Sequence, residues 1–315
     1  MTETGARAAR RPWRPLDGVL LLDKPLGLSS NDALQRARRA LAAARGGHGG
    51  TLDPLATGLL PLAFGEATKF LNDLLEADKT YRAVVQLGVS TDTADAEGAV
   101  LERRPVHLSR ENILAVCATF LGDQMQVPPM HSALKHEGRP LYALARAGLS
   151  VERPARAITV HQLSVREIDL EHARIEIEAR VSKGTYIRTL AHDLGERLGC
   201  GAHLVALRRT RVGALRLEDA VTLEQLEALP AVERDPLLAP VDALIRSLQV
   251  LELPEPLAQR FTQGQRIILD HVLRAGLPAE PSALRVYRQG RLLGVAHFDP
   301  PGRISPRRLV HQTAA

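Results

Sequence analysis

The interpretation of this chain depends on one segment, His48-Gly49-Gly50-Thr51-Leu52-Asp53-Pro54-Leu55-Ala56-Thr57-Gly58-Leu59-Leu60-Pro61. One interpretation makes Asp53 the N-cap of a helix with Pro54 at its first position, a common way for a helix to begin. The other is that the glycines bring the backbone close to a ligand while a loop presents the Asp53 carboxylate to it. The local sequence allows both, so the rest of the chain has to decide.

Composition sets broad limits on the class of protein. The chain has 315 residues, of which 45% are hydrophobic, and its formal charge of +5 with a pI near 9.5 favours a polyanionic partner. Two cysteines, Cys117 and Cys200, cannot build a disulfide framework, so we expect a cytoplasmic protein. The apolar run Leu55–Phe64 is too short to span a bilayer, and we expect no membrane association.

Regular elements surround the central segment. A short buried strand is predicted over Gly18–Asp23, followed by a helix whose N-cap is offered by Ser29, Ser30 or Asn31. The glycine run over residues 46–50 is predicted to be a loop. Alternating apolar residues predict strands over Tyr81–Leu87 and Arg174–Val181, and the second leads into a helix with Ile187, Leu190 and Leu194 on one stripe. Strands and helices mix without a βαβ rhythm, which predicts an α+β fold on a mostly antiparallel sheet.

The order of these patterns predicts three parts of the chain. Residues 1–17 are arginine-rich and lack an apolar segment, so we expect a disordered basic arm. Residues 18–245 form the main domain, and a proline-rich stretch from Pro230 to Pro256 marks its end. Residues 250–315 form a small β-rich domain, with a hairpin over Leu284–Phe298 that turns at Gln289-Gly290.

Cofactor motifs are missing from the sequence. The glycines around His48 lack the Gly-Lys-Ser/Thr ending of a phosphate-binding loop, and no dinucleotide fingerprint follows the first strand. The segment Asp92–Glu97 lacks calcium-loop spacing, and no cysteines or histidines stand at zinc-ligand spacing. We therefore expect neither a metal nor a nucleotide cofactor.

Several long motifs, taken together, resemble those of the TruB family of bacterial tRNA pseudouridine synthases. His48–Pro61 with its continuation to Phe70 resembles the family's catalytic motif. The other blocks agree in order and spacing: Gly18–Pro25 with Ser29-Ser30, Asp78–Tyr81 followed by Gly88–Gly98, Gln126–Lys135 with Gly138–Gly148, and Ser182–Arg188. The resemblance covers roughly residues 18–220, and the C-terminal part resembles the small RNA-binding PUA domain.

This resemblance implies a reaction and three catalytic residues. It implies that the chain isomerises a uridine in the T-loop of tRNA, at position 55, without a cofactor. Asp53 would be the nucleophile, and Arg188 would pair with it and keep it ionised. Tyr81 would stack on the base, and its hydroxyl is a candidate for proton transfer. Periodicity alone also allows Tyr81 to be a core residue and Arg188 to be a helix-surface cation.

The same resemblance suggests residues that bind the RNA. The target uridine must leave its stack, and His48 would occupy or stabilise the vacated position. Tyr186 would pack beside the base, or alternatively only on the sheet. Lys24 and Lys183 are candidate phosphate contacts, with solvated surface lysines as the alternative. The arginines over Arg303–Arg308 would grip the acceptor arm or simply solubilise the terminus.

Two features leave alternatives open. Family members carry aromatic residues where this chain has His131 and His136, so part of the stacking there would fall to histidine or arginine planes. A tRNA-folding chaperone role, with or without catalysis, and a guide-RNA-dependent enzyme inside a particle are the other functional hypotheses. We expect a monomer that acts on the T-arm stem-loop of tRNA without an obligatory protein partner.

Overall fold

A computed structural model describes residues 12–132 and 134–311. Its larger part is built on one ten-stranded sheet, in which most neighbouring strands are antiparallel. Along the sheet the order is β14 (Val221–Thr222), β1 (Gly18–Lys24), β3 (Ala56–Phe64), β12 (Ala202–Val212), β4 (Lys79–Leu87), β11 (Arg174–Val181), β10 (Arg156–Asp169) and β7 (Gly122–Gln126), with β2 (Gly46–His48) on β3 and β13 (Leu215–Arg216) on β12. The parallel pairs are β1 with β14 and β3 with β12. The predicted α+β fold is confirmed.

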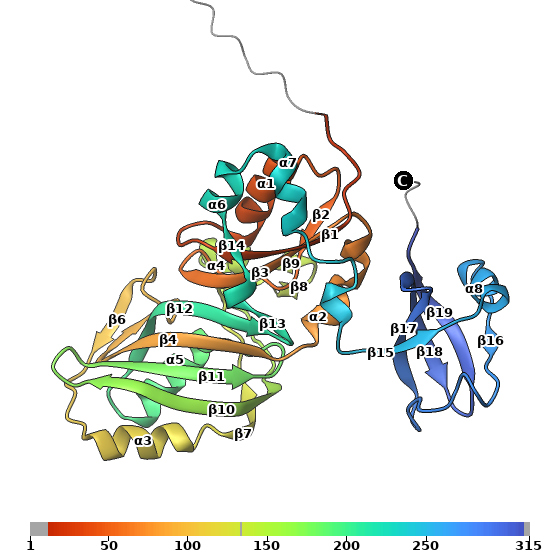
Figure 1. Cartoon of the computed structure of the whole chain (residues 1–315). Coiled ribbons are helices and arrows are strands. Elements are labelled where there is room, and N and C mark those ends of the chain that lie inside the picture. The colour runs from red at the N-terminus through yellow and green to blue at the C-terminus, as the bar shows by residue number, and fades with distance from the viewer. Residues whose placement is uncertain (1–11, 133, 312–315) are drawn as a thin grey trace, which may run out of the picture.

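Helices pack on this sheet in two groups (Figure 1). Helix α5 (Ile187–Arg197) and α3 (Arg110–Ala118) cover β4, β10, β11 and β12, and α1 (Ser30–Leu41) and α6 (Leu223–Ala228) cover β1 and β3. The remaining elements of this part are the strand pairs β5 (Val89–Thr91) with β6 (Val100–Arg103) and β8 (Lys135–His136) with β9 (Arg139–Pro140), the helices α2 (Leu71–Leu75), α4 (Leu141–Arg146) and α7 (Ala231–Arg234), and the 3-10 helices η1 (Gly65–Phe70), η2 (Leu217–Asp219), η3 (Asp235–Leu237) and η4 (Ala243–Ile245).

The predicted elements next to the central segment form for the expected reasons. The Ser29 side chain caps α1 by accepting a hydrogen bond from the Asp32 N–H (3.1 Å), and Leu34 and Leu41 of that helix are buried. In β11 every second residue, from Ile175 to Val181, is buried against α5. These strands and helices hold the two halves of the site described below.

The C-terminal part is a separate sheet (Figure 1). Its five strands, in order, are β15 (Gln249–Glu252), β17 (Ser282–Arg288), β18 (Arg291–Asp299), β19 (Arg303–Leu309) and β16 (Ile267–Ile268), with α8 (Glu255–Thr262) packed on them. The hairpin turns at Gln289-Gly290, both at positive φ, as the sequence predicts. Val295 joins residues of β1 and β3 in a shared apolar cluster, so this β-rich domain packs on the larger part.

The structure differs from two expectations, one for the N-terminal arm and one for the glycine run over residues 46–50. The predicted disordered arm extends to residue 17, and its first part, residues 1–11, lies outside the described residues. Arg14, in its described part, is paired with Asp235 through two hydrogen bonds and bridges to Ala43. The Arg38 guanidinium stacks 4.4 Å from the Trp13 ring centre, so residues 12–17 are held against α1.

The second difference concerns the glycine run. Gly46–His48 is strand β2 and not a loop, because it pairs in register with β3. A Cβ at Gly49 would lie 2.5 Å from Leu74, so glycine here allows close packing rather than a free turn.

Candidate active site

The segment that carries Asp53 is a short turn that enters a strand. Of the two interpretations of this segment, the helix beginning at Asp53 is wrong, because the chain turns at Pro54-Leu55 and enters β3 at Ala56. This strand is buried on both faces between β1 and β12, so its apolar residues favour a central strand over an amphipathic helix. Asp53 therefore lies in the turn just before a central strand, with its side chain 42% exposed.

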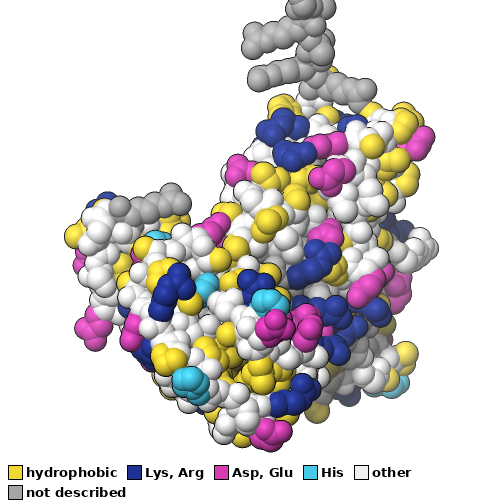
Figure 2. All heavy atoms as spheres, turned by 90° about the vertical axis from the view of Figure 1, so that its left-hand side faces the viewer, with side chains coloured by type: hydrophobic (Ala, Val, Ile, Leu, Met, Phe, Trp, Pro, Cys, Tyr) yellow, Lys and Arg dark blue, Asp and Glu magenta, His cyan; other side chains and the backbone are white. Residues whose placement is uncertain are grey.

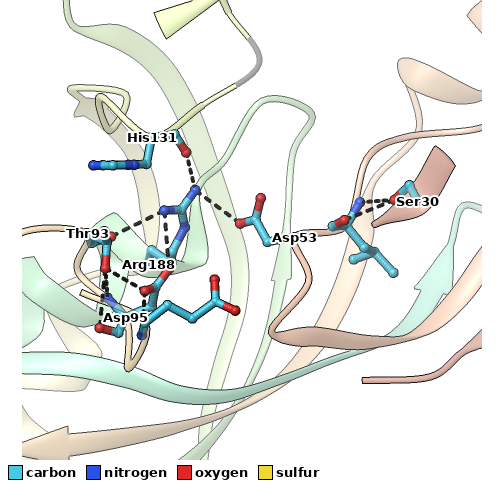
Figure 3. A network of polar contacts seen from close by, with 8 residues as sticks. Ser30, Asp53, Thr93, Asp95, His131 and Arg188 are labelled. Atoms are coloured by element: carbon cyan, nitrogen blue, oxygen red, sulfur yellow. Dashed lines mark hydrogen bonds and ion pairs between the residues drawn. The ribbon is translucent and has the colours of Figure 1, made fainter. Parts of the chain in front are cut away.

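Two neighbouring segments fix this turn (Figure 3). The Leu52 N–H donates to the buried Ser30 hydroxyl (2.7 Å), which donates in turn to the Leu52 carbonyl (3.0 Å). On the other side of Asp53, the Gly27 N–H donates to the Pro54 carbonyl (2.9 Å). The residues before and after Asp53 are thus tied to the start of α1 and to the turn that precedes it.

Arg188 lies opposite Asp53. It is the second residue of α5 and only 5% exposed. Its guanidinium is 3.0 Å from Asp53 Oδ2 and 3.3 Å from Asp95 Oδ2, and it donates to the carbonyls of Thr93 (3.2 Å) and His131 (2.6 Å) (Figure 3). Four partners on three segments hold this side chain in one place, so its position does not depend on Asp53 alone.

Asp95 is a site residue that our sequence analysis did not single out. Its side chain is 2% exposed and its Oδ1 accepts hydrogen bonds from the Thr93 hydroxyl (2.5 Å) and the Glu97 N–H (3.0 Å). The signal for it was present, since Asp95 lies in the Gly88–Gly98 block that resembles the family. A buried carboxylate beside Arg188 compensates the cation and aims it toward Asp53.

The surroundings of Asp53 act on its pKa in opposite directions. Burial within the site raises the pKa of Asp53, and the nearby Asp95 carboxylate adds to that rise. The Arg188 guanidinium is the strongest opposing influence, and the Lys24 ammonium acts in the same direction. The net pKa lies above the ordinary value for an aspartate, and Arg188 is the largest of the influences that favour the ionised form.

The two tyrosines differ in how they are placed. Tyr81 on β4 is half-buried and packs against two apolar clusters of the large part, the one under α5 and the one under α1. Tyr186 is the N-cap of α5, and the Gln126 side chain bonds its N–H (2.8 Å) and its carbonyl (3.1 Å). Burial raises the pKa of Tyr186, and Asp53 and Arg188 both act on it, which places its hydroxyl in the field of the ion pair.

His48 lies at the end of β2, on the same segment as Asp53. Burial lowers the pKa of His48, and the Arg209 guanidinium lowers it further. The ring is therefore neutral at neutral pH. Its Nδ1 is buried without a hydrogen-bond partner.

The two lysines predicted to contact phosphate lie in different surroundings. Lys24 is fully buried, and its ammonium donates to the carbonyls of Pro25 (2.9 Å) and Leu28 (2.7 Å). Burial lowers the pKa of Lys24 to about 8. The phosphate contact by Lys24 stays a prediction, and its burial and these two hydrogen bonds to the turn that contacts Pro54 argue against it. Lys183 is exposed and paired with Glu76, and its contact with RNA stays a prediction.

This difference can be measured through the salt dependence of RNA binding. We expect Lys183→Met to reduce the slope of log K against log salt by about 1, because one phosphate contact is lost. Lys24→Met is the matched control, and we expect its slope to equal that of the unaltered protein. Titration of a T-arm stem-loop at several salt concentrations gives both slopes. A reduced slope for Lys24→Met would restore the phosphate contact that the burial argues against.

Positive charge does not form one continuous field on the face shown in Figure 2. Lys and Arg side chains there gather in several groups beside Asp and Glu side chains. On this face, therefore, positive and negative side chains alternate, and the net charge does not gather into one patch. No set of three or more His, Cys, Asp or Glu side chains suited to a metal ion occurs in residues 12–132 and 134–311. Within the same ranges no helix is long and apolar enough to cross a bilayer.

Similar structures support the fold. A Cbf5-Nop10-Gar1 complex contains a chain that matches with a TM-score of 0.70 and 24% identity, over 93% of this chain and 84% of the other. An H/ACA RNP bound to a substrate RNA containing 2′-deoxyuridine matches with a TM-score of 0.69 and 22% identity, over 94% and 85%. At this level of identity the likeness concerns the fold alone.

Family models and similar sequences establish the family. The model "TruB family pseudouridylate synthase (N terminal domain)" matches residues 38–187, "tRNA pseudouridylate synthase B C-terminal domain" matches 188–246, and "Pseudouridine synthase II TruB, C-terminal" matches 250–310. A tRNA pseudouridine synthase B from Ralstonia nicotianae is 56% identical over 308 residues, which is 97% of this chain and 98% of the relative. Another, from Cupriavidus metallidurans, is 55% identical over 313 residues, which is 98% and 99%. The chain therefore belongs to the TruB family of tRNA pseudouridylate synthases.

Proposed function

We propose that this chain isomerises a uridine of the T-loop of tRNA, at position 55, to pseudouridine, with Asp53 as the nucleophile. The observation that carries the proposal is the Asp53–Arg188 pair, in which a partly exposed carboxylate meets a guanidinium that is itself held by Asp95 and two carbonyls. The relatives at more than half identity are named tRNA pseudouridine synthase B, which supports tRNA as the substrate.

The reaction requires no group from outside the RNA. The bond from the ribose C1′ to uracil N1 breaks, and a bond from C1′ to C5 forms. N1 gains a proton and C5 loses one, so the electrons balance without an oxidant or reductant. Asp53, ionised beside Arg188, attacks the nucleotide and forms a covalent bond to it, which lets the uracil detach and rotate. This bond breaks again when C1′ and C5 join, so the Asp53 carboxylate is regenerated. The Tyr81 hydroxyl is the candidate to move a proton during the rearrangement.

The other residues serve the extruded nucleotide. Removing the uridine from a folded T-loop costs a few kcal/mol of stacking. In this proposal the neutral His48 ring takes the vacated place, Tyr186 packs beside the base, and Lys183 contacts a phosphate. We also propose that the chain works in the cytoplasm as a monomer, without a guide RNA or a protein partner.

A label at uracil C5 tests the proposed reaction directly. Purified protein is mixed with a T-arm stem-loop that carries tritium at C5 of the target uridine, and tritium in water is counted. Formation of the C5–C1′ bond must release the label, so we expect release by the protein alone. A stem-loop labelled only at a uridine of the stem is the matched control and must keep its tritium. Tight binding without release from the T-loop would contradict the proposed isomerase.

A further inference from the structure

Arg209 is a buried cation that neither the motifs nor the proposed reaction use. It lies on β12 and is 1% exposed, among the largest fully buried side chains of the described chain. Its Nε donates to the Leu59 carbonyl (2.8 Å), and one of its terminal nitrogens donates to the Gly50 carbonyl (3.1 Å). In residues 12–132 and 134–311 no carboxylate forms an ion pair with it. Both of its hydrogen-bond partners are backbone.

Those two carbonyls enclose the segment that presents Asp53. Gly50 ends the glycine run on one side of Asp53, and Leu59 lies in β3 on the other. One guanidinium therefore bonds the chain at both ends of residues 50–59. Between these points Ser30 holds Leu52 and the Gly27 N–H holds the Pro54 carbonyl, so Arg209 supplies the two outer attachments of the segment.

The backbone of Arg209 is placed as closely as its side chain. Gly58 has φ +100°, and a Cβ there would lie 2.3 Å from the Arg209 carbonyl oxygen, so only glycine permits this approach of β3 to β12. On its other side Arg209 is the register partner of Tyr81 in β4. The residue thus connects the Asp53 segment with the strand that carries Tyr81.

The charge of Arg209 is not neutralised where it lies. Burial lowers the pKa values of Lys24 and Lys79 to about 8, and the Arg209 charge acts in the same direction on both. Keeping an unpaired cation in the interior is unfavourable, and an apolar side chain of similar size is often at least as stable there. A role in stability alone therefore explains this arginine poorly.

We infer that Arg209 is a positioning residue whose guanidinium fixes both ends of residues 50–59 and so sets where the Asp53 carboxylate stands opposite Arg188. The inference rests on the proposed function, because it assumes that Asp53 reacts. A displacement of about 1 Å at a reacting group lowers rates by about 10²-fold. Arg209 does not contact the RNA in this arrangement, so it acts on the chemical step rather than on binding.

The test separates the chemical step from binding. We expect Arg209→Met to lower kcat for tritium release by about 10²-fold, with KM and the Kd for the stem-loop unchanged within a factor of about two. Arg209→Lys keeps the charge but has one terminal nitrogen in place of the separate Nε and terminal nitrogens that bond Leu59 and Gly50. We therefore expect it to retain less than full kcat. Arg208→Met is the matched control: it removes the neighbouring arginine, whose two contacts with Asp23 (2.6 and 3.1 Å) tie β12 to β1. We expect it to lower Tm but to leave kcat near that of the unaltered protein.

Three outcomes would overturn the inference. They are an unchanged kcat in Arg209→Met, full activity in Arg209→Lys, and equal losses of kcat in Arg208→Met and Arg209→Met that follow their losses of Tm. If Arg209→Met does not fold, the Lys variant decides. If the unaltered protein itself releases no tritium, the proposed function fails first, so the two failures are distinguishable.

Discussion

Asp53→Asn is expected to abolish tritium release from the T-arm stem-loop while binding of the stem-loop is kept. Asparagine has nearly the shape of aspartate but no ionised oxygen to attack the nucleotide. Removing a catalytic nucleophile lowers kcat by about 10⁴-fold or more. Arg188 keeps its contacts with Asp95, Thr93 and His131, so we expect the fold and the RNA surface to persist. Single-turnover release and Kd, measured on the same protein, give the two quantities.

Asp235→Asn is the matched control for this change. Asp235 pairs with Arg14 at the periphery, so the same chemical alteration there leaves the site untouched. We expect its release rate to equal that of the unaltered protein. Release by Asp53→Asn at the unaltered rate would contradict the nucleophile. A loss of stem-loop binding in parallel with release would instead give Asp53 a role in binding the RNA.

The sequence predicted the regular elements well where the pattern is local. The alternation of apolar and charged residues over Arg174–Val181 predicted both the strand and its buried face. A serine in front of an amphipathic segment predicted the helix that begins at Ser30. The segment around Asp53 was ambiguous because Asp-Pro begins many helices. The segment that follows it forms a strand because β3 pairs with β1 and β12, and this pairing depends on residues far away in the sequence.

The site was predictable only in part for the same reason. Motif resemblance named Asp53 and Arg188, and the structure brings them together. Asp95 and Ser30 lie in motif blocks, but their contacts with Arg188 and Leu52, like those of Arg209 with Gly50 and Leu59, join distant segments, which no local pattern reports. Lys24 shows the limit of residue type as a guide: a lysine suits a phosphate contact, but this one is buried and donates two of its three ammonium hydrogens to carbonyls of the turn that it holds.

Arg188→Met is expected to lower kcat for tritium release by about 10²–10³-fold, the loss typical of removing one preorganised charged donor from an active site. Because the variant also leaves Asp95 buried without its cation, we expect the free energy of unfolding to fall by about 3–5 kcal/mol. Thermal unfolding and single-turnover release measure the two effects. A release rate equal to that of the unaltered protein would contradict the proposed role of the pair.

The pH dependence of the same variant gives a sharper test, because its sign follows from the site. Arg188 opposes the burial that raises the pKa of Asp53, so without the guanidinium this pKa rises further. The acid limb of kcat/KM reports loss of the ionised carboxylate as pH falls, and we expect it to move to higher pH in Arg188→Met. Asp95→Asn is the opposite case, because it removes a carboxylate that raises the pKa of Asp53. We expect its acid limb to move to lower pH. Its kcat should still fall, because Arg188 loses an ion-pair partner. Shifts of the same sign in the two variants would mean that the limb does not report Asp53, and its ionisation would then not be the step that Arg188 controls.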